Sequence, residues 1–374
     1  MRPKLLPICT AILLSSLSVN AIAESAKKNI LMVLSSYGEK NEQGELIKPG
    51  YEFDEMSKSY LVFKAAGTTV TFASPKGGAL ITDNFDENKP YNKEFLADEE
   101  AAKQLANTNV LSDVDTQDYD AVYVVGGKGP MYDLATNQDV KRVIKQVYQQ
   151  NGIVAAVCHG PAALLDVKLD DGSYLVNNKR ISAFTNVEET AFTKKWQLPF
   201  SLEDNLKAQG ANLIKDGLML NQVSIDGQIV TGQNPFSTAD SAIAVVQKLG
   251  LSTTGLPTFK DDNTIKLVEK FYQDRVLATK EYQANKQGYS PMLLAMSGLY
   301  QSKYATTEIE RNVALALMEL TQSDVNHPML DAAIAQTHID KSDLNKALIV
   351  LRQSQARFPD NEKIQSLLAE ISKS

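Results

Sequence analysis

The stretch Ile153-Val154-Ala155-Ala156-Val157-Cys158-His159-Gly160 decides the fold of this chain. Its first five residues are all apolar, which is the pattern of a strand buried on both faces of a sheet. The chain then turns at Cys158, with Ala156 two residues before it and Gly160 two residues after it. A reactive side chain between small neighbours at a strand-to-helix turn is typical of a nucleophile elbow. We therefore predict that a buried strand ends at Cys158 and that a helix follows it.

Apolar runs alternate with amphipathic stretches on both sides of this strand. Predicted strands lie at residues 30–34, 70–73, 121–125, 153–157 and 180–184, a predicted hairpin joins 222–225 to 228–231, and predicted helices lie at 54–66, 140–150 and 237–249. Apolar strands separated by helices are typical of a parallel sheet with helices on both faces. The sequence therefore predicts an α/β fold, followed by an all-α region.

Composition excludes several classes of protein. The chain has 374 residues, 43% hydrophobic and 22% charged, which is typical of a globular protein and not of a disordered, collagen-like or multi-span membrane protein. The net charge of −7 and the absence of a basic block argue against nucleic-acid binding. Two cysteines exclude a disulfide scaffold, and three dispersed histidines form no metal site. We expect neither a metal nor a cofactor.

Residues 1–23 have the pattern of a secretory signal peptide. Arg2 and Lys4 precede a mostly apolar run, and Ala21-Ile22-Ala23 is a small-residue cleavage site. We therefore expect an exported, periplasmic protein that is not held in a membrane after cleavage; the alternative is a retained N-terminal anchor. Cleavage would leave Cys158 as the only cysteine, so no internal disulfide is expected.

The sequence pattern changes after Gly250, from alternating strands and helices to helices alone. We expect an α/β catalytic domain at residues 24–250, a linker at 251–263 and a helical domain at 264–374. Residues 328–359 fit one tetratricopeptide-like unit, with Ala335 and Ala347 where its paired helices touch; the alternative is a generic helical bundle packed on the enzyme. We expect truncation after Gly250 to leave an active core and the tail to bind a protein partner or a second copy. The alternative is a tail that completes the core or covers the site.

Cys158 is the candidate nucleophile. A helix N-terminus after the turn would lower the pKa of the thiol by favouring the thiolate. Backbone N–H groups at the turn would point at an anion formed on a substrate. The alternative is a buried, inert cysteine.

Four segments of the chain resemble the ThiJ/PfpI superfamily, which is class I glutamine-amidotransferase-like, and within it the chaperone/glyoxalase III branch. They are Ser74-Pro75-Lys76-Gly77-Gly78, Gly126-Gly127-Lys128-Gly129, Ala156-Val157-Cys158-His159-Gly160-Pro161 and Thr231-Gly232-Gln233-Asn234-Pro235. The resemblance implies a flavodoxin-like sandwich and a Cys–His–acid arrangement. It also implies oxyanion or substrate binding at Gly126, Gly127, Lys128 and Gly129, although many relatives carry histidine in place of Lys128.

The resemblance also assigns two carboxylates to the site. A glutamate on the first helix should touch the thiol, and the spacing favours Glu55 over its neighbours Glu52 and Asp54. A carboxyl group beside a thiolate should be protonated, because two adjacent anions are costly. An acid after the elbow should orient His159 as general acid/base, and we choose Glu189 over Glu188. His327 and His338 lie in the tail, where a structural role is expected.

These residues lead to one principal hypothesis for the function. It is a cofactor-independent glyoxalase III-like enzyme that forms hydroxy acids from dicarbonyls such as methylglyoxal, or a protein deglycase acting on glycated proteins. The alternatives are a stress chaperone or cysteine redox sensor without turnover, and an amidase or peptidase of the same superfamily.

Overall fold

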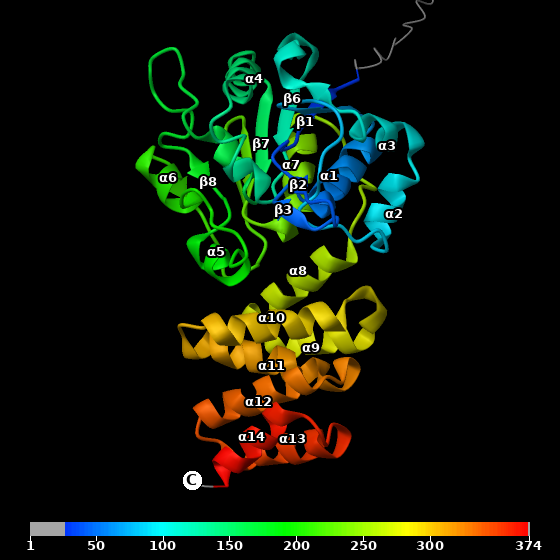
Figure 1. The fold of residues 1–374 in the computed structure, drawn as a ribbon, viewed down its shortest axis with the longest axis vertical. Coiled ribbons are helices and arrows are strands. Elements are labelled where there is room, and N and C mark those ends of the chain that lie inside the picture. Colours follow the sequence, from blue (N-terminus) through cyan, green and yellow to red (C-terminus); the bar gives the residue numbers. More distant parts are fainter. Residues whose placement is uncertain (1–26, 373–374) are drawn as a thin grey trace, which may run out of the picture.

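The computed structural model describes residues 27–372, so the predicted signal peptide lies outside the described residues. An α/β domain is followed by a stack of helices, α8 to α14, that extends away from it (Figure 1). Within residues 27–372 no helix combines the length and the hydrophobicity needed to cross a bilayer.

The α/β domain is built on a sheet of seven strands in the order β10-β11-β7-β6-β1-β4-β5. All neighbours are parallel except β10 and β11, which form an antiparallel hairpin. The strands are β1 (Asn29–Val33), β4 (Thr69–Ser74), β5 (Asn109–Val110), β6 (Ala121–Val124), β7 (Ile153–Val157), β10 (Val223–Asp226) and β11 (Ile229–Gly232). The predicted α/β fold is confirmed, with β7 as an interior strand between β11 and β6.

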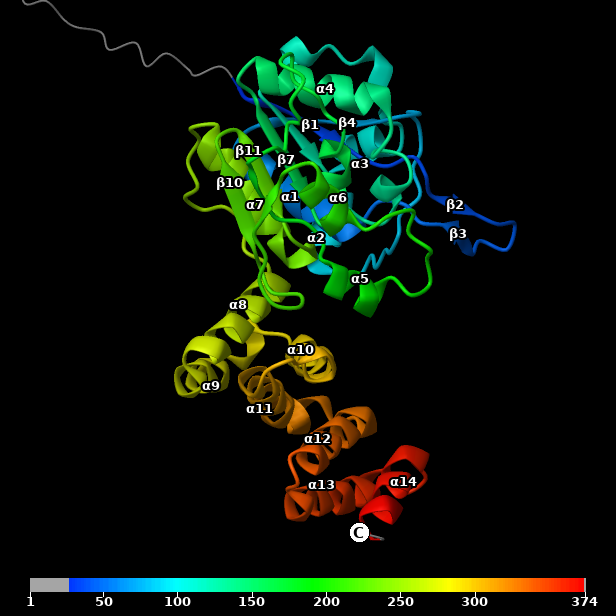
Figure 2. The ribbon, with the colours of Figure 1, turned by 90° about the vertical axis from the view of Figure 1, so that its left-hand side faces the viewer.

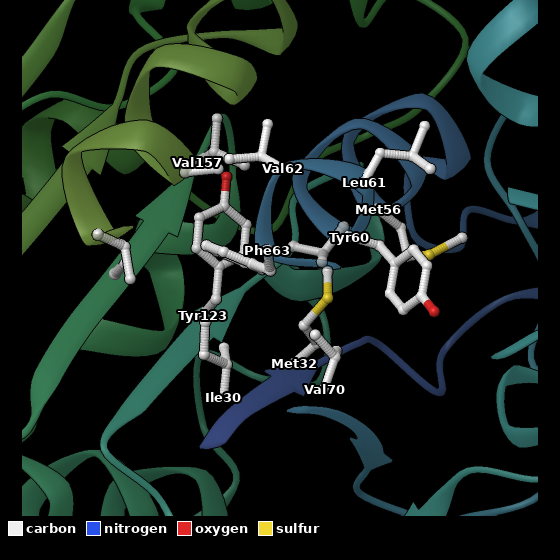
Figure 3. Close-up of a cluster of buried hydrophobic side chains, with 14 of the residues drawn as sticks. Ile30, Met32, Met56, Tyr60, Leu61, Val62, Phe63, Val70, Tyr123 and Val157 are labelled. Carbon is white, nitrogen blue, oxygen red and sulfur yellow. The ribbon is translucent and has the colours of Figure 1, made fainter. Parts of the chain in front are cut away.

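Helices cover both faces of this sheet. Successive side chains of a strand point to opposite faces, and β1 divides its residues in this way. Ile30 and Met32 pack in one cluster with α1 (Phe53–Ala65) and α7 (Thr238–Lys248). Leu31 and Val33 pack in a second cluster with α4 (Gln138–Gln149). Figure 3 shows the first cluster, in which Phe63 of α1 lies beside Tyr123 of β6.

Shorter elements surround the sheet. They are β2 (Glu39–Lys40), β3 (Leu46–Lys48), α2 (Pro90–Leu96), α3 (Glu99–Leu105), β8 (Arg180–Ile181), α5 (Asn186–Phe192), α6 (Leu202–Ala208) and β9 (Asn212–Leu213). The strand predicted at 180–184 is present but shorter, because only Arg180–Ile181 is a strand, and it pairs with β9 in a separate two-stranded sheet.

The prediction of a helix after Cys158 is wrong. Gly160–Leu164 forms a short 3₁₀ turn, because Leu165 is already extended, with ψ 142°, and Asp166 has a positive φ of 58°. The chain turns back after one apolar turn, and no α-helix starts at the cysteine.

The C-terminal region contains α8 (Lys260–Gln273), α9 (Arg275–Ala284), α10 (Pro291–Tyr304), α11 (Glu308–Val325), α12 (Pro328–Asp340), α13 (Leu344–Arg357) and α14 (Glu362–Ile371). Figure 2 shows these helices stacked one after another. Ala335 of α12 and Ala347 of α13 are both fully buried in one cluster, as expected for a tightly packed helix pair. The assignment of this pair to the tetratricopeptide class stays a prediction.

The stretch predicted as a linker is packed against the α/β domain. Phe259 is buried in the α1-side cluster, and Leu251 and Leu256 pack against the same cluster. The helix α8 begins at Lys260, four residues before the predicted start of the helical domain at 264. The apolar residues of this stretch cover part of the α/β domain, so the stretch is not a free linker.

A buried ion pair joins α1 to α8. The Lys58 ammonium lies 2.8 Å from an Asp262 carboxylate oxygen, and the two side chains are only 3% and 5% exposed. The rings of Tyr91 and Phe259 flank the ammonium at 4.8 and 5.6 Å. A chain that ends at Gly250 would keep Lys58 without its partner. Whether residues 24–250 fold and act without the helical region stays a prediction.

We expect Asp262→Ala to lower the free energy of unfolding by about 3–5 kcal/mol, because it leaves an uncompensated charge in the interior. Urea denaturation followed by the fluorescence of the single tryptophan, Trp196, measures the loss. Lys266→Ala is the matched control, because it breaks an exposed pair between α8 and Asp240 of α7 and should cost less than about 1 kcal/mol. Equal losses in the two variants would contradict a special role of the buried pair.

Candidate active site

Cys158 lies at the carboxyl end of β7 in a strained backbone conformation. Its φ is 60°, which non-glycine residues rarely adopt. Two hydrogen bonds hold this turn: the Cys158 N–H donates to the Gly232 carbonyl at 3.0 Å, and the Cys158 carbonyl accepts from the Phe184 N–H at 2.9 Å. A strained residue that its surroundings hold from both sides marks a functional site.

Two glycines after β6 allow the backbone to pass close to the Cys158 thiol. A Cβ on Gly126 would lie 2.6 Å from a Glu55 carboxyl oxygen and 2.8 Å from the Cys158 Cβ. Gly127 has a φ of 83°, and a Cβ there would lie 2.5 Å from the Glu52 nitrogen. Only glycine fits at either position. The Gly127 N–H acts to lower the pKa of the Cys158 thiol.

Glu55 is the carboxyl group that the structure places beside the thiol. It is fully buried on α1, and its Oε2 accepts a hydrogen bond from the Gly126 N–H at 2.8 Å. Its Oε1 is buried without a hydrogen-bond partner, and the Glu55 and Cys158 side chains are close enough that each changes the pKa of the other. Burial and the nearby Glu52 charge raise the pKa of Glu55 well above its usual value, so the group is protonated at neutral pH.

The two neighbouring carboxylates have other partners. Glu52 accepts a hydrogen bond from the Asn84 side chain at 3.2 Å, and Asp54 pairs with Lys89 and accepts from Asn92. Burial raises the pKa of Glu52 to about 7, with the Asp54 and Asp83 charges acting in the same direction.

The thiol itself differs from the sequence prediction. Burial first, and then the Glu55 carboxyl, raise the pKa of Cys158 well above its usual value, while the Gly127 N–H and Lys128 act in the opposite direction. The predicted lowering by a helix N-terminus does not apply, because a 3₁₀ turn follows the residue and the side chain is buried. The resting site therefore holds a thiol that must lose its proton as it reacts.

His159 is placed to accept that proton. Its Nδ1 lies 3.5 Å from the Cys158 sulfur, and its ring packs on Phe184 with centroids 4.4 Å apart. Burial, assisted by the Lys128 charge, lowers the pKa of His159 to about 3. The imidazole is therefore neutral and has a lone pair available at neutral pH.

Glu189, rather than Glu188, faces the histidine. Glu189 Oε1 lies 3.8 Å from His159 Nε2, and neither buried atom has a hydrogen-bond partner. Burial raises the pKa of Glu189 to about 7. Glu188 points elsewhere: it forms a capping box with Thr185 and accepts from the side chains of Gln233 and Asn234.

The four predicted substrate-binding residues after β6 do not share one role. The N–H of Gly126 donates to Glu55 and that of Gly129 donates to the Gly50 carbonyl at 2.8 Å. The Lys128 ammonium lies 2.8 Å from a carboxylate oxygen of buried Asp83. Of the four residues, Gly127 and Lys128 act on the thiol, since both lower its pKa.

Sequence reasoning missed the partner of Lys128. Asp83 lies in a loop with no pattern around it, and no signal in the sequence connects it to Lys128, 45 residues later. The two tail histidines are remote from Cys158. His338 pairs with Glu319 at 3.0 Å, and His327 caps α12. Among the residues from 27 to 372 no cluster of three potential metal ligands occurs.

Relatives that are named for their enzymatic activity match the α/β part of the chain. A glutathione-independent glyoxalase of Schizosaccharomyces pombe, hsp3102, is 33% identical over 236 residues, which cover 59% of this chain and 98% of the relative. Glyoxalase 3 of Candida albicans is 31% identical, over 58% of this chain and 96% of the relative.

Solved structures match the same part. The Rapid Encystment Protein of 24 kDa from Francisella tularensis is 33% identical, with a TM-score of 0.56, and the match covers 59% of this chain and 99% of that protein. The model of the DJ-1/PfpI family matches residues 45–248, which include every predicted site residue. The chain therefore belongs to the DJ-1/PfpI family.

Proposed function

We propose that this protein is a glutathione-independent glyoxalase that converts 2-oxoaldehydes, such as methylglyoxal, into 2-hydroxy acids without a cofactor. The observation that carries the proposal is a nucleophile placed between two proton-transfer groups. The Cys158 thiol has the protonated Glu55 carboxyl on one side and the neutral His159 ring, 3.5 Å away, on the other. The curated relatives named glyoxalases support the same reaction.

The first step forms a hemithioacetal. The Cys158 sulfur bonds to the aldehyde carbon while its proton passes to His159 Nδ1, and the carbonyl π bond breaks. Glu55 donates its proton to the new alkoxide and becomes a carboxylate. Glu189 stabilises the imidazolium that forms, since it lies 3.8 Å from Nε2. The Gly127 N–H favours negative charge beside the sulfur.

The next steps move one proton and consume one water. The Glu55 carboxylate removes the proton from the hemithioacetal carbon and returns a proton to the neighbouring carbon, while His159 moves the hydroxyl protons through an enediol. The product is a thioester of the 2-hydroxy acid. Water then attacks the thioester as Glu55 takes a proton from it, and His159 returns a proton to the leaving sulfur. No oxidant or reductant is consumed.

The test is turnover of methylglyoxal in deuterated buffer, without glutathione and with a metal chelator present. We expect lactate that carries solvent deuterium on its second carbon, because the enediol exchanges its proton with groups in the site. Proton NMR measures both the product and the label. Absence of lactate would contradict the proposed function, and lactate free of deuterium would contradict exchange of the Glu55 proton with solvent between its removal from one carbon and its return to the next.

We further propose that the protein acts after export to the periplasm and that removal of early glycation adducts from proteins uses the same thiol. The pattern of residues 1–23 supports export, and N-terminal sequencing of the protein recovered from a periplasmic extract tests it. Recovery of the full-length chain from the cytoplasm alone would contradict export.

A further inference from the structure

The helix that carries Glu189 touches the helical stack at its C-terminal end. The Phe192 ring of α5 packs edge-on against Tyr300 of α10, with centroids 4.8 Å apart and planes at 61°. Phe192 also packs against the core of the α/β domain. Because Phe192 comes three residues after Glu189, the two side chains lie on neighbouring parts of one helix face. A contact that fixes Phe192 therefore helps to fix Glu189.

The N-terminal end of α5 is held within the α/β domain itself. The capping box of Thr185 and Glu188 closes the first turn. The buried Glu188 carboxylate also accepts hydrogen bonds from the Gln233 and Asn234 side chains and from the Met219 N–H. The helix has only seven residues. One end is thus anchored by a hydrogen-bond network, and the other end packs on a ring of the helical stack.

The distance between His159 and Glu189, which depends on the position of α5, is slightly longer than a hydrogen bond. His159 Nε2 and Glu189 Oε1 are 3.8 Å apart, and both are buried without a partner. A hydrogen bond between nitrogen and oxygen requires about 2.7–3.2 Å. A shift of α5 by less than about 1 Å therefore decides whether the pair forms.

We propose that Tyr300 is a positioning residue, which holds α5 so that Glu189 can bond to His159 when the imidazole takes the thiol proton. This inference rests on the proposed function, in which His159 is the proton acceptor. In this proposal the helical stack positions a residue of the active site, although the family match ends at residue 248. The charged groups that act on Glu189 are Glu188 on its own helix and Glu203 and Asp204 of α6, and His159 faces it.

The experiment compares full-length variants at Tyr300. We expect Tyr300→Ala to lower kcat for methylglyoxal about ten- to a hundredfold, because misplacement of a catalytic group by about 1 Å has an effect of this size. KM should change little. Tyr300→Phe should retain activity, because the ring and not the hydroxyl makes the contact. Met296→Ala is the control, since it removes a half-exposed side chain one turn before Tyr300 that lines, together with Tyr300, a pocket to which α5 contributes no residue.

A double-mutant cycle separates positioning from general damage. If Tyr300 acts through Glu189, adding Tyr300→Ala to Glu189→Gln should cause no further loss, and the two single variants should show the same altered pH profile of kcat/KM. The proposal would be overturned if the losses of the two single variants multiplied in the double variant. It would also be overturned if Tyr300→Ala behaved like Met296→Ala. If circular dichroism shows that Tyr300→Ala is unfolded, Phe192→Leu tests the same contact from α5.

A second readout does not depend on turnover. The pH dependence of Cys158 alkylation by iodoacetamide, located by peptide mass mapping, reports how readily the thiol loses its proton. We expect Tyr300→Ala and Glu189→Gln to shift this profile equally and Met296→Ala to leave it unchanged. Failure of the wild type to turn over methylglyoxal would contradict the proposed function alone, whereas an unshifted alkylation profile would contradict the role of Tyr300.

Discussion

Cys158→Ala should abolish conversion of methylglyoxal, with a loss of about 10⁴-fold or more in kcat, because covalent catalysis ends when the nucleophile is removed. Glu55 and His159 would still be present, but neither can form the hemithioacetal. Lactate formation measured by proton NMR gives the size of the loss. Activity above about a tenth of the wild-type value would contradict covalent catalysis by this residue.

The fold should survive this substitution. Alanine at position 158 inherits the same strained φ of 60° and leaves only a small cavity in place of the sulfur. Removal of one buried heavy atom costs about 1 kcal/mol, so thermal unfolding should shift by a few degrees only. Cys158→Ser is the matched control, because a neutral hydroxyl fills the site but is a far weaker nucleophile. We expect it to be folded and equally inactive.

Glu55→Gln should lower turnover by about 10²–10⁴-fold, the usual contribution of a positioned general acid/base. Glutamine can still accept the hydrogen bond from the Gly126 N–H, but it cannot donate a proton to the alkoxide or remove one from carbon. Glu52→Gln is the control, because this nearby carboxyl is bonded to Asn84 and not to the thiol. A silent Glu55→Gln beside a damaging Glu52→Gln would contradict the assignment.

The same substitution should stabilise the protein above pH 7. Burial raises the pKa of Glu55 in the folded protein, whereas an unfolded glutamate titrates near 4.3. Folding must therefore keep a proton on Glu55, and this cost is absent below about pH 4 and grows as the pH rises. Glutamine carries no such cost. Melting temperatures at pH 5 and pH 8 should diverge more in the wild type than in Glu55→Gln.

The parts of the fold that depend on local pattern were predictable from the sequence. The apolar strands, the turn at Cys158 and the register that selects Glu55 over Glu52 and Asp54 all follow from side-chain periodicity and family spacing. Glu189 and Glu188 are adjacent in the chain, and only the capping box explains why one faces the histidine and the other faces away.

Features that depend on tertiary burial were not predictable. The raised pKa of Cys158 arises from desolvation and from a carboxyl group far away in the sequence, neither of which the elbow motif shows. Pro161 to Leu164 have the composition of a helix start, but the chain turns back at Leu165. Likewise, the buried pair of Lys58 and Asp262 joins residues 204 positions apart, so the predicted linker appeared to be free.

The strained turn at Cys158 has a consequence for the evolution of this protein. A left-handed backbone costs about 1 kcal/mol or more for any residue with a Cβ, and glycine alone adopts it freely. The packing of the buried Cys158 side chain offsets this cost, because loss of its sulfur alone costs about 1 kcal/mol. Stability alone therefore does not choose between glycine and cysteine at position 158, whereas the chemistry of the site requires the thiol.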